Sequence, residues 1–295
     1  MTPAERMCSP QGSVTRMKIL ATLTFLFATI GCVRDARTGG HDIAPQTLSP
    51  AGAAAQTPSP KEPLPDGVLK LIKAYPEHIV GGAANEVRWE DGSVMAYDDG
   101  QRNKTFIELL DRPDLEDGFR FGYDTKAETP GVNHDPGRIR YEPFFLKMYG
   151  ATKEQVKANL VEVVWLPKTV NQKILVTRVN GVNEKVKMIS EELDRTPEFK
   201  RYLENIGGTF NWRRISGTDR LSTHSFGITI DINTRYSNYW QWDCKCKDEG
   251  ARLTYRNQIP MQVVEVFEKH GFIWGGRWYH YDTMHFEYRP ELLTN

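Results

Sequence analysis

The sequence predicts an α+β fold, with an antiparallel sheet flanked by helices. Strand-like segments and segments with helical spacing of apolar residues follow one another without regular alternation, which disfavours a doubly wound parallel sheet. The 295 residues are 39% hydrophobic and 26% charged, which is enough for a folded core and excludes wholesale disorder. A mean hydropathy of −0.53 excludes a protein with several membrane spans.

The charges balance, with 38 basic and 38 acidic residues. The sequence therefore lacks the basic surplus of nucleic-acid-binding proteins, and we expect no nucleic-acid partner. Four cysteines in this length do not make a disulfide scaffold. We expect the protein to be a monomer.

The N-terminus predicts a secretion signal. Arg16 and Lys18 precede an apolar run over 19–30, and a basic stretch before a short apolar core is typical of such signals. The run is shorter than the roughly 20 residues that span a bilayer. Residues 29–32 (TIGC) resemble the lipobox of bacterial lipoproteins, which implies that Cys32 is lipidated and becomes the mature N-terminus. A soluble secreted protein is the alternative.

The expected domain organisation is a signal peptide over 1–31, a linker over 32–63, an accessory subdomain over 64–150 and the main domain over 151–295. The linker is rich in Pro, Ala, Gly, Thr and Ser, so it cannot bury a core. A tether after a lipid anchor lets a domain reach outward from a membrane. We therefore expect an extracytoplasmic, lipid-anchored protein, at the outer membrane where the host envelope has one.

The first folded elements are expected within the accessory region. Residues 87–97 predict a hairpin around Asp91-Gly92. The rest of this region is rich in Asp, Gly and Pro and shows little periodicity. Thr152 with Gln155 predicts a capping box that opens a helix, with Val156 and Leu160 on one face.

Further elements follow from periodicity. The expected strands are 173–179, 209–215, 227–232, 272–274 and 284–288, and the expected helices cover 186–193, 199–206 and 261–270. Gly207-Gly208 and Gly271 are expected to end the last two helices.

The candidate metal-binding and catalytic residues are concentrated near two of the expected strands, 227–232 and 284–288. Side chains alternate faces along a strand, so Ile228 and Ile230 are expected to face the core and Asp231 the opposite side. Gly227 has no side chain to block the space between His224 and Asp231. A loop histidine can therefore fold back and meet the aspartate.

The expected strand over 284–288 and the residues just before it supply the remaining candidate residues. His285 and Glu287 share one face, and Asp282 lies just before the strand. Two imidazoles and one carboxylate, from His224, Asp231 and His285, make a three-ligand zinc set that leaves a fourth position open for water. Asp282 is a further carboxylate that can accept the proton of that water. Taken alone, the His224 and Asp231 pair or the Asp282 and His285 pair could also consist of structural residues held by hydrogen bonds.

These motifs resemble the zinc D-alanyl-D-alanine carboxypeptidase and L-alanyl-D-glutamate endopeptidase family, which includes phage endolysin peptidases and vancomycin-resistance dipeptidases. The matching motifs are Ser222-x-His224-x-x-Gly227-x-x-x-Asp231, Gly271-Phe272-x-Trp274-Gly275-Gly276-x-Trp278 and Asp282-x-x-His285-Phe286-Glu287. The resemblance covers 150–295 and is strongest over 209–289. It implies one zinc ion on His224, Asp231 and His285, with Asp282 as the general base. Residues 64–150 match no catalytic domain of this family.

The family also uses an arginine upstream of the first zinc histidine, where a fixed positive charge stabilises the oxyanion. Arg213 best fits that position, and Arg214 and Arg220 are alternatives. Strand alternation would place Arg213 and Arg214 on opposite faces. Ser222 and Trp278 are expected to contact substrate, although Trp278 fits core packing equally well.

The resemblance implies an extracytoplasmic zinc peptidase that cuts bonds involving D-residues in peptidoglycan stem peptides, as a carboxypeptidase or an endopeptidase. A non-catalytic, zinc-containing wall-binding lipoprotein is the alternative. His280 is expected at the rim of the site, or among the residues that support the ligands, rather than on the metal. Cys244 and Cys246 are too close in sequence for an unstrained disulfide to be assumed, so pairing and metal binding stay open.

Overall fold

The computed structural model describes residues 63–294. The expected signal peptide, Cys32 and the linker up to residue 62 lie outside the described residues. The described residues 63–294 belong to one compact unit. Across 63–294, no helix combines the length and the apolar character needed to cross a membrane.

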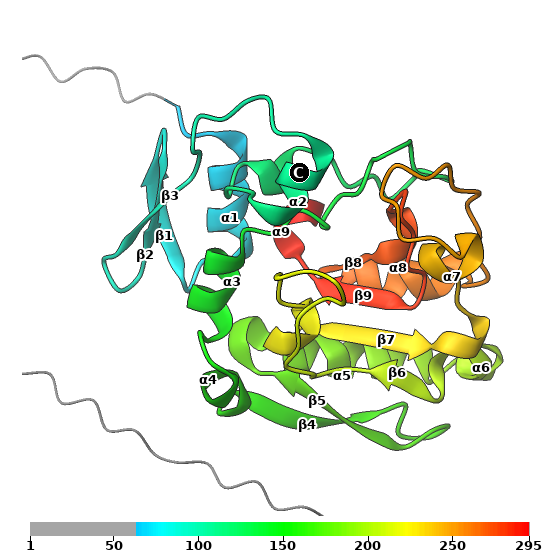
Figure 1. Ribbon diagram of the computed structural model, residues 1–295. Helices are drawn as coiled ribbons and strands as arrows, with labels where there is room; N and C mark the ends of the chain where they lie inside the picture. The colour runs from blue at the N-terminus through cyan, green and yellow to red at the C-terminus, as the bar shows by residue number, and fades with distance from the viewer. Residues whose placement is uncertain (1–62, 295) are drawn as a thin grey trace, which may run out of the picture. The chain divides into compact units, whose positions relative to one another are not determined.

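Three antiparallel sheets organise the described residues, which confirms the α+β class (Figure 1). The strands are β1 (Ile79–Ala83), β2 (Glu86–Trp89), β3 (Val94–Ala96), β4 (Leu160–Trp165), β5 (Gln172–Thr177), β6 (Ile206–Gly208), β7 (Thr229–Asn233), β8 (Phe272–Trp274) and β9 (His285–Tyr288). The sheet orders are β1-β2-β3, β4-β5 and β6-β7-β9-β8.

Helices cover these sheets, and α5 packs against both β4 and α8. The α-helices are α1 (Asp66–Ala74), α2 (Phe106–Asp111), α3 (Glu142–Tyr149), α4 (Lys153–Lys157), α5 (Val182–Leu193), α6 (Lys200–Leu203), α7 (Trp240–Cys244), α8 (Met261–Lys269) and α9 (Pro290–Leu293). The mixture of helical and strand segments along the chain thus forms helices packed on antiparallel sheets.

One hydrophobic core joins the regions on either side of residue 150. Leu71 of α1 and Phe144 of α3 belong to the same buried cluster as Ile189 of α5 and Phe286 of β9. The Tyr75 hydroxyl also donates a hydrogen bond of 2.6 Å to the buried Glu291 carboxylate. The segment expected to be accessory therefore shares its core with the segment that carries the chemistry.

The hairpin expected over 87–97 is confirmed. β2 and β3 pair antiparallel, and the Gly92 amide donates to the Trp89 carbonyl at 3.0 Å. Gly92 has a φ of +81°, in the left-handed region that glycine adopts without a Cβ penalty. The Asp91 carboxylate accepts from the Ser93 hydroxyl at 2.7 Å, which fixes the turn.

Two expectations after residue 150 are wrong. Thr152 does cap α4, since its Oγ accepts from the Gln155 amide at 3.2 Å. The helix ends at Lys157, however, and Leu160 begins β4. The β-branched residues of β4 pair with β5 along its whole length, and this tertiary pairing overrides the helical spacing.

The strand expected over 209–215 is also wrong. The strand of this part of the chain is β6, over Ile206–Gly208, where a helix end was expected. Residues 209–215 instead form an extended loop, held by contacts with the following turn. The Arg213 amide donates to Ser225 Oγ at 3.0 Å, and the Ser222 amide donates to the Arg213 carbonyl at 3.0 Å.

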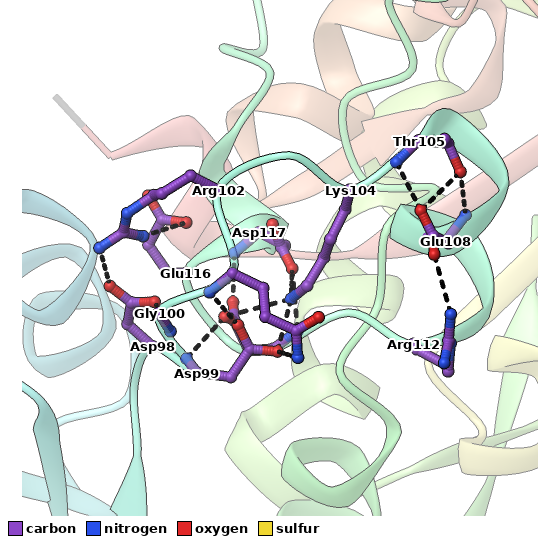
Figure 2. A network of polar contacts seen from close by, with 12 residues as sticks. Asp98, Asp99, Gly100, Arg102, Lys104, Thr105, Glu108, Arg112, Glu116 and Asp117 are labelled. Atoms are coloured by element: carbon purple, nitrogen blue, oxygen red, sulfur yellow. Dashed lines mark hydrogen bonds and ion pairs between the residues drawn. The ribbon is translucent and has the colours of Figure 1, made fainter.

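A buried lysine organises the irregular segment between β3 and α2 (Figure 2). Lys104 Nζ lies 2.8 Å from Asp99, 3.3 Å from Asp114 and 2.5 Å from Asp117. Its side chain is only 5% exposed. Burial opposes the charge, but the surrounding carboxylates outweigh it and raise the pKa of Lys104. The ammonium group thus offsets part of the negative charge of these three carboxylates, of which Asp114 and Asp117 are buried.

Replacing Lys104 with Met is therefore expected to destabilise the protein by about 3 kcal/mol. This is the lower end of the range for breaking a buried ion pair, because Asp99 remains partly in water. Urea unfolding of the variant measures the effect. Lys126→Met is the matched control, because Lys126 is exposed and should change stability by less than about 0.5 kcal/mol. Equal stability of both variants would contradict this role for Lys104.

Candidate metal centre

The register of two strands assembles the centre. β7 and β9 lie side by side (Figure 1), with Asp231 directly opposite His285 and Thr229 opposite Glu287. On the other face, Ile230 is opposite Phe286, and both are fully buried. The alternation expected for these strands is thus confirmed. It places the polar side chains on one face and the apolar side chains in the core.

Three potential ligands meet on that face. His224 lies on the 3-10 turn Thr223–Phe226 before β7, and its Nε2 is 3.0 Å from Asp231 Oδ2. His285 Nδ1 is 3.1 Å from Asp231 Oδ1. The ligand atoms of these three residues all lie within 4.8 Å of one another. The structure therefore brings together the three ligands expected from the sequence.

Hydrogen bonds orient both imidazoles toward the shared carboxylate. His224 Nδ1 donates to the Thr209 carbonyl at 2.5 Å, which leaves Nε2 to face Asp231. His285 Nε2 donates to Glu287 Oε2 at 2.9 Å, which leaves Nδ1 to face Asp231. Such outer partners fix the tautomer of metal-binding histidines. A donor set of two imidazoles and one carboxylate fits zinc with a position left for water.

Zinc would have to displace a proton from this centre. Burial opposes a charged imidazole, but hydrogen bonds to Asp231 and Glu287 raise the pKa of His285 to about 10. The raised pKa favours an imidazolium at His285 in the metal-free protein, whereas zinc needs the neutral form.

We expect zinc binding to release at least one proton between pH 6 and pH 8. The apparent affinity should therefore rise about tenfold for each pH unit, and this gain should stop above the pKa of His285. Calorimetry in buffers of different ionisation enthalpy counts the released protons. A zinc affinity independent of pH over this range would show that the metal-free protein does not hold His285 as an imidazolium.

The role of Gly227 differs from the expected one. It has a φ of +69° and ends the turn that carries His224. A Cβ at this position would lie 2.6 Å from a Leu160 methyl carbon and 3.1 Å from the Thr177 amide nitrogen. Glycine is therefore needed for the left-handed turn and for the close approach of β4 and β5, rather than for space between His224 and Asp231.

Asp282 lines the same cleft as the three potential ligands. Its Oδ1 is buried and has no hydrogen-bond partner within 63–294. Burial, followed by the negative charge of Asp231, raises the pKa of Asp282 to about 7. Burying a carboxylate oxygen without a hydrogen-bond partner costs free energy of folding. Such an atom in a native structure therefore points to a functional role. Its position and basicity suit a group that accepts a proton.

Glu287 has a different role from Asp282. Its Oε2 accepts from His285, from Thr223 Oγ1 at 3.0 Å and from Arg140 Nη2 at 2.7 Å. Its Oε1 accepts from Arg289 at 3.0 Å. Burial opposes ionisation, but these cations keep the pKa of Glu287 well below its usual range. Glu287 is thus an ionised acceptor that positions His285.

Sequence reasoning missed Arg140 and Thr223 as partners of Glu287. Arg140 belongs to the region before residue 150 and is 147 positions from Glu287. No local motif marks such a contact. Thr223, by contrast, lies inside the quoted motif beside His224 and could have been noticed as a neighbouring hydroxyl.

The three candidate arginines occupy different positions. Arg213 and Arg220 line the metal cleft, whereas Arg214 is absent from its lining. Arg213 is exposed, and within the described residues its side chain makes one hydrogen bond, of 3.4 Å to the Arg214 carbonyl. Arg213 is therefore available to a substrate, and its assignment stays a prediction.

Ser222, Trp278 and His280 also line the cleft. The Trp278 ring lies 5.4 Å from the His285 ring, and its indole N–H donates to the Pro136 carbonyl. Both His280 nitrogens are occupied, with Nδ1 2.6 Å from Asp135 and Nε2 3.0 Å from the Glu249 carbonyl. His280 therefore lies outside the ligand group.

Cys244 and Cys246 form a disulfide at the end of α7. The pairing that the sequence left open is therefore present, and these sulfur atoms do not belong to a metal-ligand group of the described residues. Trp242, two residues earlier, lines the cleft and is exposed.

Residues 216–288 match a family model described as D-alanyl-D-alanine carboxypeptidase. Over this stretch the chain is therefore similar to peptidases of the D-alanyl-D-alanine carboxypeptidase type. The match confirms the resemblance found in the sequence, and it includes all three potential zinc ligands and Asp282. Arg213 and the segment 63–150 lie outside it. No curated protein and no solved structure matches the chain significantly.

Proposed function

We propose that this peptidase is a zinc enzyme that hydrolyses peptide bonds involving D-amino acids in peptidoglycan stem peptides, as a D,D-carboxypeptidase or an L-Ala-D-Glu endopeptidase. The observation that carries the proposal is the meeting of His224, Asp231 and His285, with each imidazole oriented by its own partner. The family match supports the peptidase class.

The chain's own residues would divide the reaction between them. A bound zinc ion supplies Lewis-acid polarisation of the carbonyl and a more acidic water. Asp282 Oδ1 accepts the proton of the attacking water and delivers it to the leaving amine. Arg213 holds the negative charge that develops on the carbonyl oxygen. Trp278 and Ser222 border the space in which the peptide lies.

A zinc-containing protein that only binds the cell wall is the second candidate. A binder would need the three ligands but no buried carboxylate with an unpaired oxygen. The Oδ1 atom of Asp282 is buried without a hydrogen-bond partner among the described residues, and burial together with the charge of Asp231 raises the pKa of this group to about 7. Such perturbed groups in a cleft favour catalysis over binding.

Digestion of purified peptidoglycan, followed by mass analysis of the released fragments, tests the proposal. Release of D-Ala indicates a carboxypeptidase, and a cut between L-Ala and D-Glu indicates an endopeptidase. Asp282→Asn is the control for contaminating hydrolases. Intact peptidoglycan after incubation with the zinc-loaded protein would favour the binding role.

The proposed location is extracytoplasmic, with lipid attached at Cys32. We expect the wild-type protein to enter the detergent phase on phase partitioning, because acyl chains supply about 0.8 kcal/mol per buried CH₂. Cys32→Ser should remain in the aqueous phase or keep an uncleaved signal, with the catalytic unit unchanged. A Cys32→Ser protein that is processed and still partitions into detergent would contradict lipid attachment at this residue.

A further inference from the structure

A second cavity adjoins the metal cleft. Its volume is about 520 Å³, against about 300 Å³ for the metal cleft. Arg138, Arg140 and Arg220 line both cavities, as do Ile215 and Thr218. The two spaces therefore share a wall that is rich in guanidinium groups.

The three arginines differ in how fully their donors are used. Arg138 makes three hydrogen bonds to two carboxylates, at 2.9 Å to Asp135 and at 2.9 and 2.8 Å to Glu249. Arg140 uses Nη2 and Nε on Glu287, at 2.7 and 3.3 Å. Its Nη1 has no hydrogen-bond partner in the described part of the chain.

Arg220 has the most donors to spare. Its Nε makes an ion pair of 3.3 Å with Asp111 Oδ1, without hydrogen-bond geometry, and its two Nη atoms have no partner among residues 63–294. The Arg220 side chain is 21% exposed, whereas that of Asp111 is 52% exposed. Burial, and then the positive charge of Arg138, lowers the pKa of Arg220. The positive charge of this guanidinium group is therefore only partly balanced by nearby carboxylates.

Carboxylates on the same cavity wall do not supply the missing partner. The Glu142 Oε2 accepts from the Leu221 amide at 2.8 Å. Asp111 is the weak partner already described. Asp219 is exposed and makes no hydrogen bond or ion pair within the described residues. The free donors of Arg140 and Arg220 thus remain available to an external anion.

We propose that the second cavity is a subsite in which Arg220 and Arg140 Nη1 bind a carboxylate of the substrate peptide. A planar guanidinium group with two unpaired donors matches a carboxylate in geometry and charge. Arg140 also contacts Glu287, which contacts His285, so the subsite adjoins the metal ligands. This proposal rests on the proposed function and adds that the enzyme selects acidic peptides.

The first test uses the wild-type, zinc-loaded protein. A synthetic stem peptide with all its carboxylates free is compared with peptides in which one carboxylate at a time is amidated. We expect one of these amidations to lower kcat/KM by about 10- to 100-fold, the range for losing hydrogen bonds to a charged group. Equal cleavage of all the peptides would overturn the subsite, while the proposed function would stand. No cleavage of any peptide would instead overturn the proposed function.

The second test assigns the preference to Arg220. Arg220→Gln should reduce the ratio of kcat/KM for the acidic and amidated peptides to near one, and Arg220→Lys should restore part of it. Asp111→Asn should raise the ratio, because it removes the one carboxylate paired with Arg220. Asp111 is exposed, so this variant remains informative even where Arg220→Gln fails to fold.

Arg252→Gln is the control, because Arg252 is exposed and lines neither cavity. It should leave the ratio at its wild-type value. An equal loss of kcat for both peptides in Arg220→Gln would indicate an oxyanion role and overturn the subsite. A ratio that neither Arg220→Gln nor Asp111→Asn changes would overturn it as well.

Discussion

Asp282→Asn is expected to lower peptide hydrolysis by about 10²–10⁴-fold while zinc stays bound. Asparagine preserves the shape of the side chain but cannot accept the proton of the attacking water. Removing a general base costs about this much, and the upper end is expected because the same group returns the proton to the leaving amine. The buried, unpaired Oδ1 of Asp282 supports this role.

Asp231→Asn is the matched comparison. An amide oxygen is a weaker zinc ligand than a carboxylate, so this variant should lose metal and activity together. Zinc content and peptide cleavage are measured side by side on both variants. Loss of zinc in Asp282→Asn, or near-normal turnover, would place the base elsewhere. Glu287 lies on the same strand face as His285, but its oxygens already accept hydrogen bonds from His285, Arg140 and Arg289.

Removing either histidine ligand is expected to remove most of the bound zinc. His224→Ala and His285→Ala each delete one of three ligands, and even loss of an outer partner costs about 10–100-fold in metal affinity. His280→Ala should keep its zinc, because both His280 nitrogens bind Asp135 and Glu249 instead. Metal analysis of the three purified variants measures the difference. Unchanged zinc in His285→Ala would contradict the ligand assignment.

The ligand face could be predicted because it depends on local rules. Strand alternation places Asp231 and His285 opposite the buried Ile230 and Phe286, and that pattern is visible in the sequence. The antiparallel α+β class follows from similar periodicity. These features need only a few neighbouring residues.

Long-range contacts could not be predicted in the same way. Arg140 reaches Glu287 across 147 positions, and Asp135 reaches His280 across 145. These pairs lie in a segment of low periodicity, so nothing local marks them. The close approach of Leu160 to Gly227 was missed because it depends on where β4 packs, which is a tertiary contact.

Metal removal and restoration tests the zinc-peptidase account most directly. The protein is stripped with a chelator, and stem-peptide cleavage is followed as zinc is added back. The account predicts no cleavage by the stripped protein and full recovery near one equivalent of zinc, with Asp282→Asn binding the same amount of zinc but staying inactive. Cleavage by the stripped protein, or an inactive wild type at full zinc occupancy, would contradict it.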